Sequence, residues 1–187
     1  MRFGGDIPKP LLPLGGQTLL ARALASALAS RLAPVLCVVS DAEVEDEVPE
    51  QVEVVHNADP TRGIASSLQT ALTALAGNER IGAVVVGLAD QPLVGAEAYR
   101  RVSDARNDTT PLAVATYGGV RGNPVMIARS LWPDAMALTG DEGARVLIRR
   151  YGAREVPCDD TGEPTDIDTP DDLAALEQRW RSQTASE

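Results

Sequence analysis

The sequence predicts a layered α/β domain with a mostly parallel sheet, and three observations lead to that fold class. Short apolar runs alternate with segments of helical periodicity along the chain, which is typical of strands connected by helices. The most apolar run, residues 83–88, is continuous and rich in valine, as expected of a strand covered on both faces. A chain of 187 residues that is 44% hydrophobic is long enough for one domain with a sizeable core.

Helices are predicted where apolar residues recur three and four positions apart. Thr18 is placed to cap the first helix and Thr169 to cap the last, where Pro170 takes the first helical position. The acidic stretch 41–48 indicates a surface turn or a short helix. The predicted helices cover residues 18–32, 63–76, 96–105, 131–138, 143–151 and the stretch that begins at 170.

Strands are predicted where short runs of β-branched and aliphatic residues stand between these helices. Two adjacent glycines, Gly118 and Gly119, indicate a turn, so the strand that follows should run back antiparallel and make the sheet mixed. The predicted strands cover residues 35–39, 52–55, 83–88, 112–117, 123–128 and 154–157.

The composition argues against nucleic-acid and membrane partners. Seventeen basic and 27 acidic side chains give a net charge of −10, which repels polyanions and anionic lipid. Aromatic residues, at 3%, are too few for a base-stacking platform. No segment approaches a membrane span or the apolar stretch of a signal peptide, so a cytoplasmic location is expected. The two cysteines are expected to be reduced thiols.

Three aspartates are candidates for metal chemistry. Asp90 lies just past the carboxyl end of the strand predicted at 83–88. In open α/β sheets, ligands bind at this end of the strands. In extended backbone, Asp166 and Asp168 point the same way while Ile167 enters the core. Taken one at a time, Asp90 is also typical of a solvent-exposed turn, and Asp166 and Asp168 are also typical of residues that cap a helix. Together they favour a divalent cation such as Mg²⁺, held by carboxylates from two elements.

Two glycine-containing segments are candidates for binding phosphate. The first holds Arg2 and Lys9, the only lysine of the chain, beside glycines that let backbone N–H groups approach an anion. The second, residues 62–68, places Gly63 before two serines at the start of a helix, which ordinary helix initiation also explains. Further polar groups lie beside glycines at 121–124 and 140–145, where each segment alone also suits a turn.

Taken in order, these motifs resemble the MobA-like nucleotidyltransferases, above all the molybdenum-cofactor cytidylyltransferases and related accessory proteins. The resemblance extends over essentially the whole chain, and the ordered set is more specific than any one motif. The motifs that carry it are Arg2-Phe3-Gly4 and residues 8–14, 63–68, 89–92, 122–124, 140–145 and 166–170.

The resemblance implies one domain over residues 1–187 with a Rossmann-like, three-layer, glycosyltransferase-A-type nucleotide-binding fold. It also implies Mg²⁺-dependent transfer of a nucleoside monophosphate from an NTP, CTP before GTP, to a phosphorylated acceptor, with release of pyrophosphate. Molybdopterin is the favoured acceptor, and 2-phospholactate or a sugar phosphate is the alternative. A different class of function is a non-catalytic accessory module that binds the cofactor or a molybdenum hydroxylase.

Roles for individual residues follow from the same resemblance. Asp90 and Asp168 are expected to hold Mg²⁺, with Asp90 and Lys9 as the catalytic pair. The triphosphate and the leaving pyrophosphate are assigned to Arg2 and Lys9. The expected nucleotide pocket is lined by Gly63, Ser66 and Ser67, and the expected acceptor site by Asn123, Asp141 and Arg145.

One departure from the family pattern concerns the first residues. Family members begin with a strand and a turn of the type L-A-A-G-x-S-x-R, whereas this sequence begins at what resembles the final arginine, Arg2. The first strand and most of the phosphate loop are therefore expected to be missing, leaving an N-terminally incomplete domain. Three explanations of this departure are open. The natural start lies upstream of residue 1, the chain is truncated, or the protein is a degenerate copy with weakened NTP binding.

Overall fold

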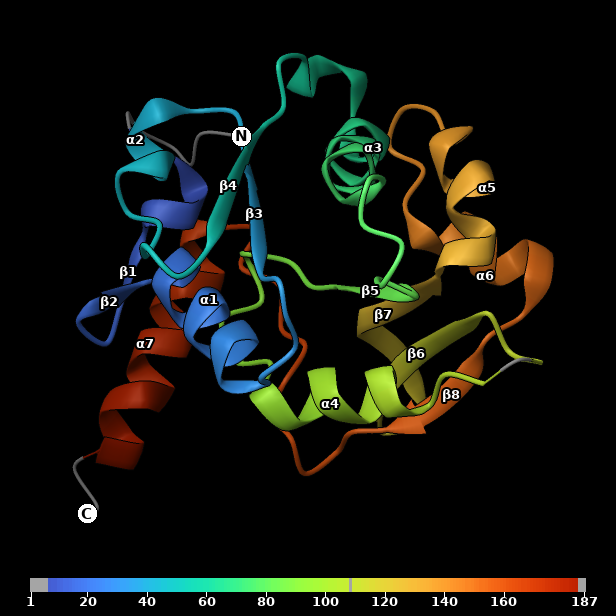
Figure 1. Ribbon diagram of the computed structural model, residues 1–187. Helices are drawn as coiled ribbons and strands as arrows, with labels where there is room; N and C mark the ends of the chain where they lie inside the picture. The colour runs from blue at the N-terminus through green and yellow to red at the C-terminus, as the bar shows by residue number, and fades with distance from the viewer. Residues whose placement is uncertain (1–6, 108, 185–187) are drawn as a thin grey trace.

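The computed structural model describes residues 7–107 and 109–184 and confirms the α/β fold class (Figure 1). Short 3₁₀ turns cover Lys9–Leu11, Pro60–Arg62 and Arg129–Leu131. The helices are α1 Leu19–Ala29, α2 Ala42–Glu45, α3 Ile64–Leu75, α4 Ala96–Asp104, α5 Trp132–Met136, α6 Ala144–Tyr151 and α7 Pro170–Thr184. The strands are β1 Pro13–Leu14, β2 Gln17–Thr18, β3 Leu36–Val39, β4 Glu53–His56, β5 Ala83–Val86, β6 Leu112–Tyr117, β7 Val120–Ala128 and β8 Arg154–Pro157.

Side-chain caps fix the first and last helices where the sequence predicts them. The Thr18 hydroxyl accepts a hydrogen bond from the backbone N–H of Ala21 at 3.0 Å, so α1 begins at Leu19, directly after Thr18. Before α7, the Asp172 carboxylate accepts from the backbone N–H of Thr169 at 2.7 Å, while the Thr169 hydroxyl accepts from the Asp172 N–H at 3.2 Å. This reciprocal pair is a capping box with an acidic partner, and it holds the segment just before it in a defined position.

The sheets are mixed, as the predicted antiparallel return requires. Strands β3 and β4 pair in parallel. A second sheet has the order β5-β7-β6-β8, in which β7 is antiparallel to both neighbours and β6 is parallel to β8. The hairpin of β1 and β2 was not predicted, because strands of two residues are too short to show a hydrophobic period.

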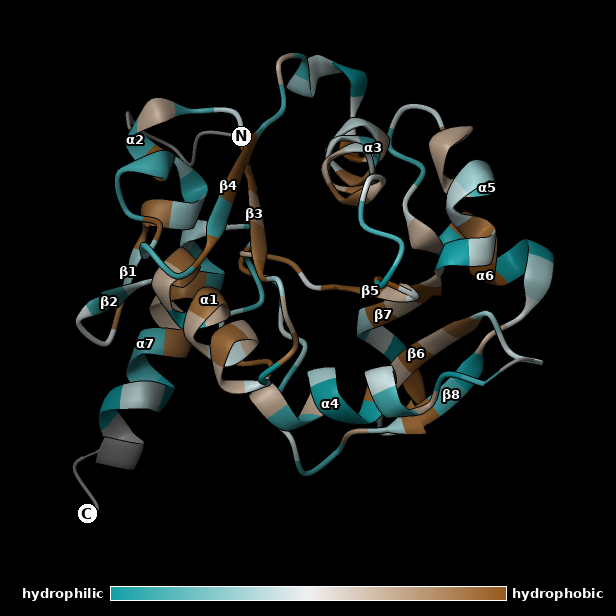
Figure 2. Ribbon diagram, in the orientation of Figure 1, coloured by the Kyte–Doolittle hydropathy of each residue, from teal (hydrophilic) through white to brown (hydrophobic). Residues whose placement is uncertain are grey.

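The four-stranded sheet buries both faces, giving three layers. Alternate residues of its strands point to opposite sides, so Val114 and Ile127 pack toward α3, α5 and α6, whereas Ala113 and Met126 pack toward α4. Figure 2 shows hydrophobic residues along β3 and β6. Both cysteines are free thiols, as predicted, and both are buried. Among the described residues, no helix has the length and apolar character of a membrane span.

Gly162 fixes the route of the chain toward the acidic residues at 166 and 168. Its φ of +124° is a conformation that L side chains rarely adopt, and a Cβ there would collide with the carbonyl oxygen of Leu93 and lie 3.0 Å from the Gly95 nitrogen. The close approach belongs to the bridge between Val94 and Gly162.

Gly162→Ala is therefore expected to lower the free energy of unfolding by about 2–4 kcal/mol, because strain and a backbone clash act together. Urea unfolding measures the loss. Gly77→Ala is the matched control, since no atom lies within 4 Å of its added methyl group. Equal unfolding midpoints for the two variants would contradict the role given to Gly162.

Candidate functional site

Three distant parts of the chain meet at one lysine. Lys9 lies in the first 3₁₀ turn, Asp90 lies four residues beyond the end of β5, and Asp168 lies just before α7. The Lys9 ammonium donates to Asp90 Oδ2 at 2.7 Å and to Asp168 Oδ1 at 2.7 Å, although these partners are 81 and 159 positions away in the sequence. The two carboxylates therefore converge on one point, and we call Lys9, Asp90, Asp166 and Asp168 the acidic cluster.

The Lys9 side chain is the buried centre of this cluster. It is 11% exposed, whereas the side chains of Asp90 and Asp168 are 30% and 69% exposed. Burial alone lowers the pKa of Lys9, but the hydrogen bonds to Asp168 and Asp90 and their charges outweigh it, so the pKa is raised above its usual value. The ammonium therefore keeps its charge at neutral pH.

Asp90 holds an unsatisfied oxygen. Its Oδ1 atom is buried and has no hydrogen-bond partner among the described residues, while its Oδ2 atom accepts from Lys9. A buried acceptor without a partner is costly, and one on a charged group is especially so. The free lone pairs suit a cation or a donor on a bound molecule.

Asp166 brings a third carboxyl group to the cluster. Gln91 donates to its Oδ1 atom at 2.8 Å. Burial raises the pKa of Asp166, and the nearby negative charges of Asp90 and Asp168 add to that rise, against the lowering effect of the Gln91 hydrogen bond. Between the two acids of its segment, Ile167 is fully buried, as predicted, and its backbone N–H donates to the carbonyl of Asp90 at 3.1 Å.

The carboxylates of the acidic cluster fit a hard divalent cation that takes only one or two of its ligands from the protein. Within the described ranges, no group of three or more His, Cys, Asp and Glu side chains is arranged to hold a metal ion. Asp90 and Asp168 could still supply two carboxylate oxygens, and the partnerless Oδ1 of Asp90 gives such an ion a direct ligand. This suits Mg²⁺, which takes one or two carboxylates and completes its shell with phosphate oxygens and water.

A second group of predicted residues surrounds the start of α3. Gly63, with φ +81°, packs so closely on Gly140 that a Cβ would collide with its backbone and lie 2.7 Å from Asp141 Oδ1. Arg145 donates to the Asp141 carbonyl at 3.1 Å. The structure thus brings Gly63, predicted for the nucleotide, next to Asp141 and Arg145, predicted for the acceptor.

Asn57 organises the two serines of this region, and the sequence analysis missed it. Its buried amide donates to Ser66 Oγ at 2.8 Å and to Ser67 Oγ at 3.0 Å. Ser66 is buried and donates to the Gly63 carbonyl at 2.8 Å, so its hydroxyl is fully engaged within the protein, whereas Ser67 is only half-buried. Asn57 follows directly after β4, and a polar residue just past the end of a predicted strand is the signal that could have identified it.

Of the two remaining predicted residues, Asn123 lies within the described part of the chain. The backbone carbonyl of Asn123 accepts from the Tyr117 hydroxyl at 3.0 Å, and the preceding Gly122 lies beside Pro164, close in sequence to Asp166. Arg2 lies outside the described residues. The predictions for both residues stay untested.

Comparison with known proteins gives one family. The model of the MobA-like NTP transferase domain matches residues 1–156. The molybdenum cofactor cytidylyltransferase of Escherichia coli (strain K12) is 23% identical over 129 residues, which are 69% of this chain and 64% of that protein. The purine catabolism protein PucB of Bacillus subtilis (strain 168) is 33% identical over 99 residues, 50% of this chain and 47% of that protein. The matches therefore span about two thirds and about half of these curated relatives.

Solved structures agree over nearly the whole chain. Rv0371c from Mycobacterium tuberculosis H37Rv superposes with a TM-score of 0.80 at 28% identity and covers 95% of this chain and 91% of that chain. A second structure of Rv0371c, in complex with manganese, has a TM-score of 0.76 at 28% identity and covers 91% of this chain and 92% of that chain.

Proposed function

The chain belongs to the MobA-like NTP transferase family, and from that premise we propose that it transfers a nucleoside monophosphate from an NTP to a phosphorylated acceptor and releases pyrophosphate. The observation that carries the proposal is the convergence of Asp90 and Asp168 on the Lys9 ammonium, 2.7 Å from each. CTP is the favoured nucleotide, ahead of GTP, and molybdopterin the favoured acceptor, because a molybdenum cofactor cytidylyltransferase is among the relatives.

The reaction joins a terminal phosphate oxygen of the acceptor to the α-phosphorus of the NTP. The bond from that phosphorus to the bridging oxygen of the β-phosphate breaks, and pyrophosphate leaves with the electron pair. Such transfers depend on positioning and on neutralising charge rather than on a protein nucleophile. Lys9 supplies a fixed positive charge, because its raised pKa keeps it protonated, and Arg2 is proposed to add a second.

Asp90 and Asp168 are proposed to hold a divalent cation beside that charge. The support is chemical, since the Asp90 carboxylate has a buried oxygen without a partner, and a relative of known structure, Rv0371c, has been solved in complex with manganese. When bound, Mg²⁺ or Mn²⁺ neutralises phosphate oxygens and orients the triphosphate. The hydrogen bond that Asp166 accepts from Gln91 holds the acidic segment in place.

The nucleotide is proposed to lie against the start of α3. The support is the half-buried Ser67 hydroxyl, which lies in the first turn of this helix beside Gly63. Ser66 is proposed to shape the pocket from behind, because its hydroxyl already bonds to Asn57 and Gly63. Asp141 and Arg145 border the same region and, with Asn123, are proposed to contact the acceptor.

Asn57→Ala is expected to raise the KM for the nucleotide about tenfold with a smaller change in kcat. Its amide fixes both serine hydroxyls, and each neutral hydrogen bond contributes about 0.5–1.5 kcal/mol. Steady-state kinetics with varied nucleotide measure the two constants separately. Asn78→Ala is the matched control, since the Asn78 side chain accepts from the backbone N–H of Arg80 in a turn after α3. An unchanged KM in Asn57→Ala would remove this residue from the pocket.

The proposed activity is tested by pyrophosphate release from the purified protein. We expect release with Mg²⁺ or Mn²⁺, CTP and molybdopterin, slower release with GTP, and none when either metal or acceptor is left out. Replacing molybdopterin by 2-phospholactate or a sugar phosphate tests the alternative acceptors. Molybdopterin binding without release from any NTP would overturn the enzyme proposal and favour the accessory module.

A further inference from the structure

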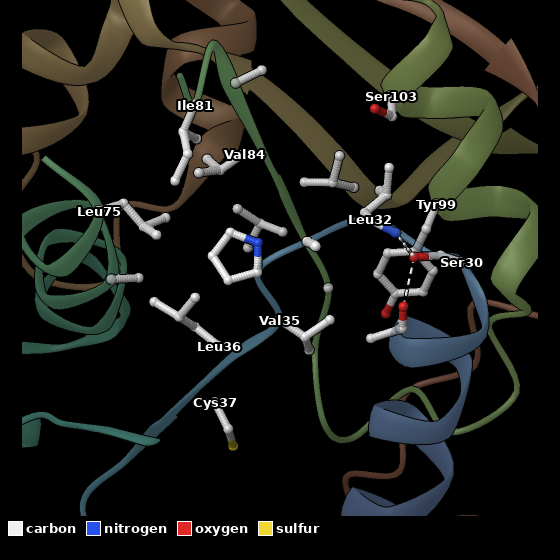
Figure 3. A pocket seen from close by; sticks show the side chains of 18 of the residues that line it. Ser30, Leu32, Val35, Leu36, Cys37, Leu75, Ile81, Val84, Tyr99 and Ser103 are labelled. Atoms are coloured by element: carbon white, nitrogen blue, oxygen red, sulfur yellow. Dashed lines mark hydrogen bonds between the residues drawn. The ribbon is translucent and has the colours of Figure 1, made fainter. Parts of the chain in front are cut away.

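The acidic cluster lies outside the large cavity of the protein. That cavity has a volume of about 970 Å³ and lies between β3 and β5 (Figure 3). After β5 its lining continues to Ala89, but it includes neither Asp90 nor Asp168 nor Lys9. Packing around the cavity therefore positions the chain as far as Ala89, and other contacts must fix the residues that follow.

The segment that follows β5 pairs with the segment that precedes α7. At one end of this pairing, the Glu163 N–H donates to the Leu93 carbonyl at 3.1 Å. At the other end, the Ile167 N–H donates to the Asp90 carbonyl, also at 3.1 Å. The two segments thus run in opposite directions, and the second bond lies next to the carboxylates that bind Lys9.

Two prolines interrupt the backbone pairing between these bonds. Pro92 and Pro164 have no N–H to donate, so the backbones cannot continue the ladder there. Among the described residues, the hydrogen bonds across this gap come from the side chain of Gln91. Its Nε2 atom donates to the Pro164 carbonyl at 3.3 Å and to Asp166 Oδ1 at 2.8 Å. Gln91 therefore joins the two segments where their backbones cannot.

The other end of the Gln91 amide indicates that stability alone does not explain this residue. Gln91 is 5% exposed, and its Oε1 atom is buried without a hydrogen-bond partner among the described residues. The amide cannot be turned round, because Oε1 would then face the Pro164 carbonyl, which has no hydrogen to donate. A buried acceptor without a partner is costly, and an apolar side chain of the same shape would avoid that cost. An apolar side chain could not, however, donate to the segment that carries the acidic residues.

We propose that Gln91 is a positioning residue, which holds Asp168 beside Asp90 so that both carboxylates reach one divalent cation. This role rests on the metal site of the proposed function. Lys9 also joins the two carboxylates, but its charge repels an incoming cation, whereas the Gln91 amide is neutral and keeps its bonds. The Asp168 side chain is 69% exposed, so packing does not fix it. Its place depends on the adjoining backbone, which the capping box anchors on one side and Gln91 on the other.

Gln91→Met tests this role, because methionine has a similar length and shape but donates no hydrogen bond. We expect the Kd for Mn²⁺ to rise about tenfold or more, as is typical when a group that orients metal ligands is removed. Loss of the EPR signal of free Mn²⁺, without nucleotide, measures the Kd. Thr161→Val is the matched control, since it removes a buried hydroxyl whose bond, to the Cys158 carbonyl at 2.8 Å, stays on its own side of the pairing. That variant should keep the Kd within about twofold of the wild type.

Urea unfolding of both variants shows whether each is folded when Mn²⁺ is added. A folded Gln91→Met with the wild-type Kd, or an equal rise of the Kd in Thr161→Val, would overturn the role of Gln91. A wild-type protein that binds no Mn²⁺ would instead overturn the metal site itself, and with it the proposed function.

Two variants of Asp166 test the same hydrogen bond if Gln91→Met fails to fold. Asp166→Asn removes the charge but keeps an oxygen that accepts from Gln91, whereas Asp166→Ala removes both. Because the variants differ in this hydrogen bond and not in charge, we expect Asp166→Ala to bind Mn²⁺ about fivefold more weakly than Asp166→Asn. Equal affinities of these two variants would then show that Gln91 does not position the acidic residues.

Discussion

Asp90→Asn is expected to lower kcat for pyrophosphate release by about 10²–10³ while the protein stays folded. Asparagine has the same shape but no negative charge, so the site loses half of the pair that converges on Lys9. Removing one preorganised electrostatic group from a transfer site typically has an effect of about this size. Rates at saturating nucleotide and metal, together with urea unfolding, measure activity and stability separately.

Asp171→Asn is the matched control for this variant. Asp171 is an acidic residue three positions beyond Asp168, in the first turn of α7, and it makes no contact with the acidic cluster in the hydrogen bonds of the described residues. The same substitution there should leave kcat within about twofold, as surface changes usually do. If the two variants turn over equally fast, Asp90 does not hold a catalytic metal ion, and the proposed site is wrong.

The fold was predictable where a local rule decides the outcome. Thr18 and Thr169 predict the starts of their helices, because a capping hydroxyl bonds to a backbone N–H only three residues further along the chain. The antiparallel β7 follows from two glycines in a turn. The pairing of β5 is different, since a run of valines has the same sequence whether one or both of its edges are paired.

The candidate site was predictable as a set of residues but not as a geometry. The sequence identifies Asp90 and Asp168 as carboxylates near the ends of elements, yet nothing in it measures the distance between positions 90 and 168. Lys9 was expected to meet phosphate, and the structure adds that it neutralises both carboxylates. Asn57 was overlooked because its role depends on hydrogen bonds to Ser66 and Ser67, which only the tertiary fold brings within reach.

Lys9→Met is expected to destabilise the protein by about 1–3 kcal/mol in the absence of divalent metal. Methionine fills nearly the same space without the charge, so the carboxylates of Asp90 and Asp168 are left to repel each other around a buried centre. Most of the loss should come from Asp90, because Asp168 is more exposed and water screens its charge. Urea unfolding in a chelating buffer measures this difference.

Adding Mg²⁺ should restore part of that stability, and this response distinguishes a metal site from a purely structural ion bridge. In the wild type the ammonium and the cation share the same two carboxylates and repel each other, whereas in Lys9→Met a cation can take the place of the ammonium. At ten times its dissociation constant, a bound ion stabilises the folded state by about 1.4 kcal/mol. Arg121→Met, which breaks the exposed pair with Glu155, is the control and should show no extra response to Mg²⁺. A cation that binds to these two carboxylates must bind more tightly once the ammonium is gone. Equal responses to Mg²⁺ in the wild type and in both variants would therefore mean that Asp90 and Asp168 converge only to hold Lys9.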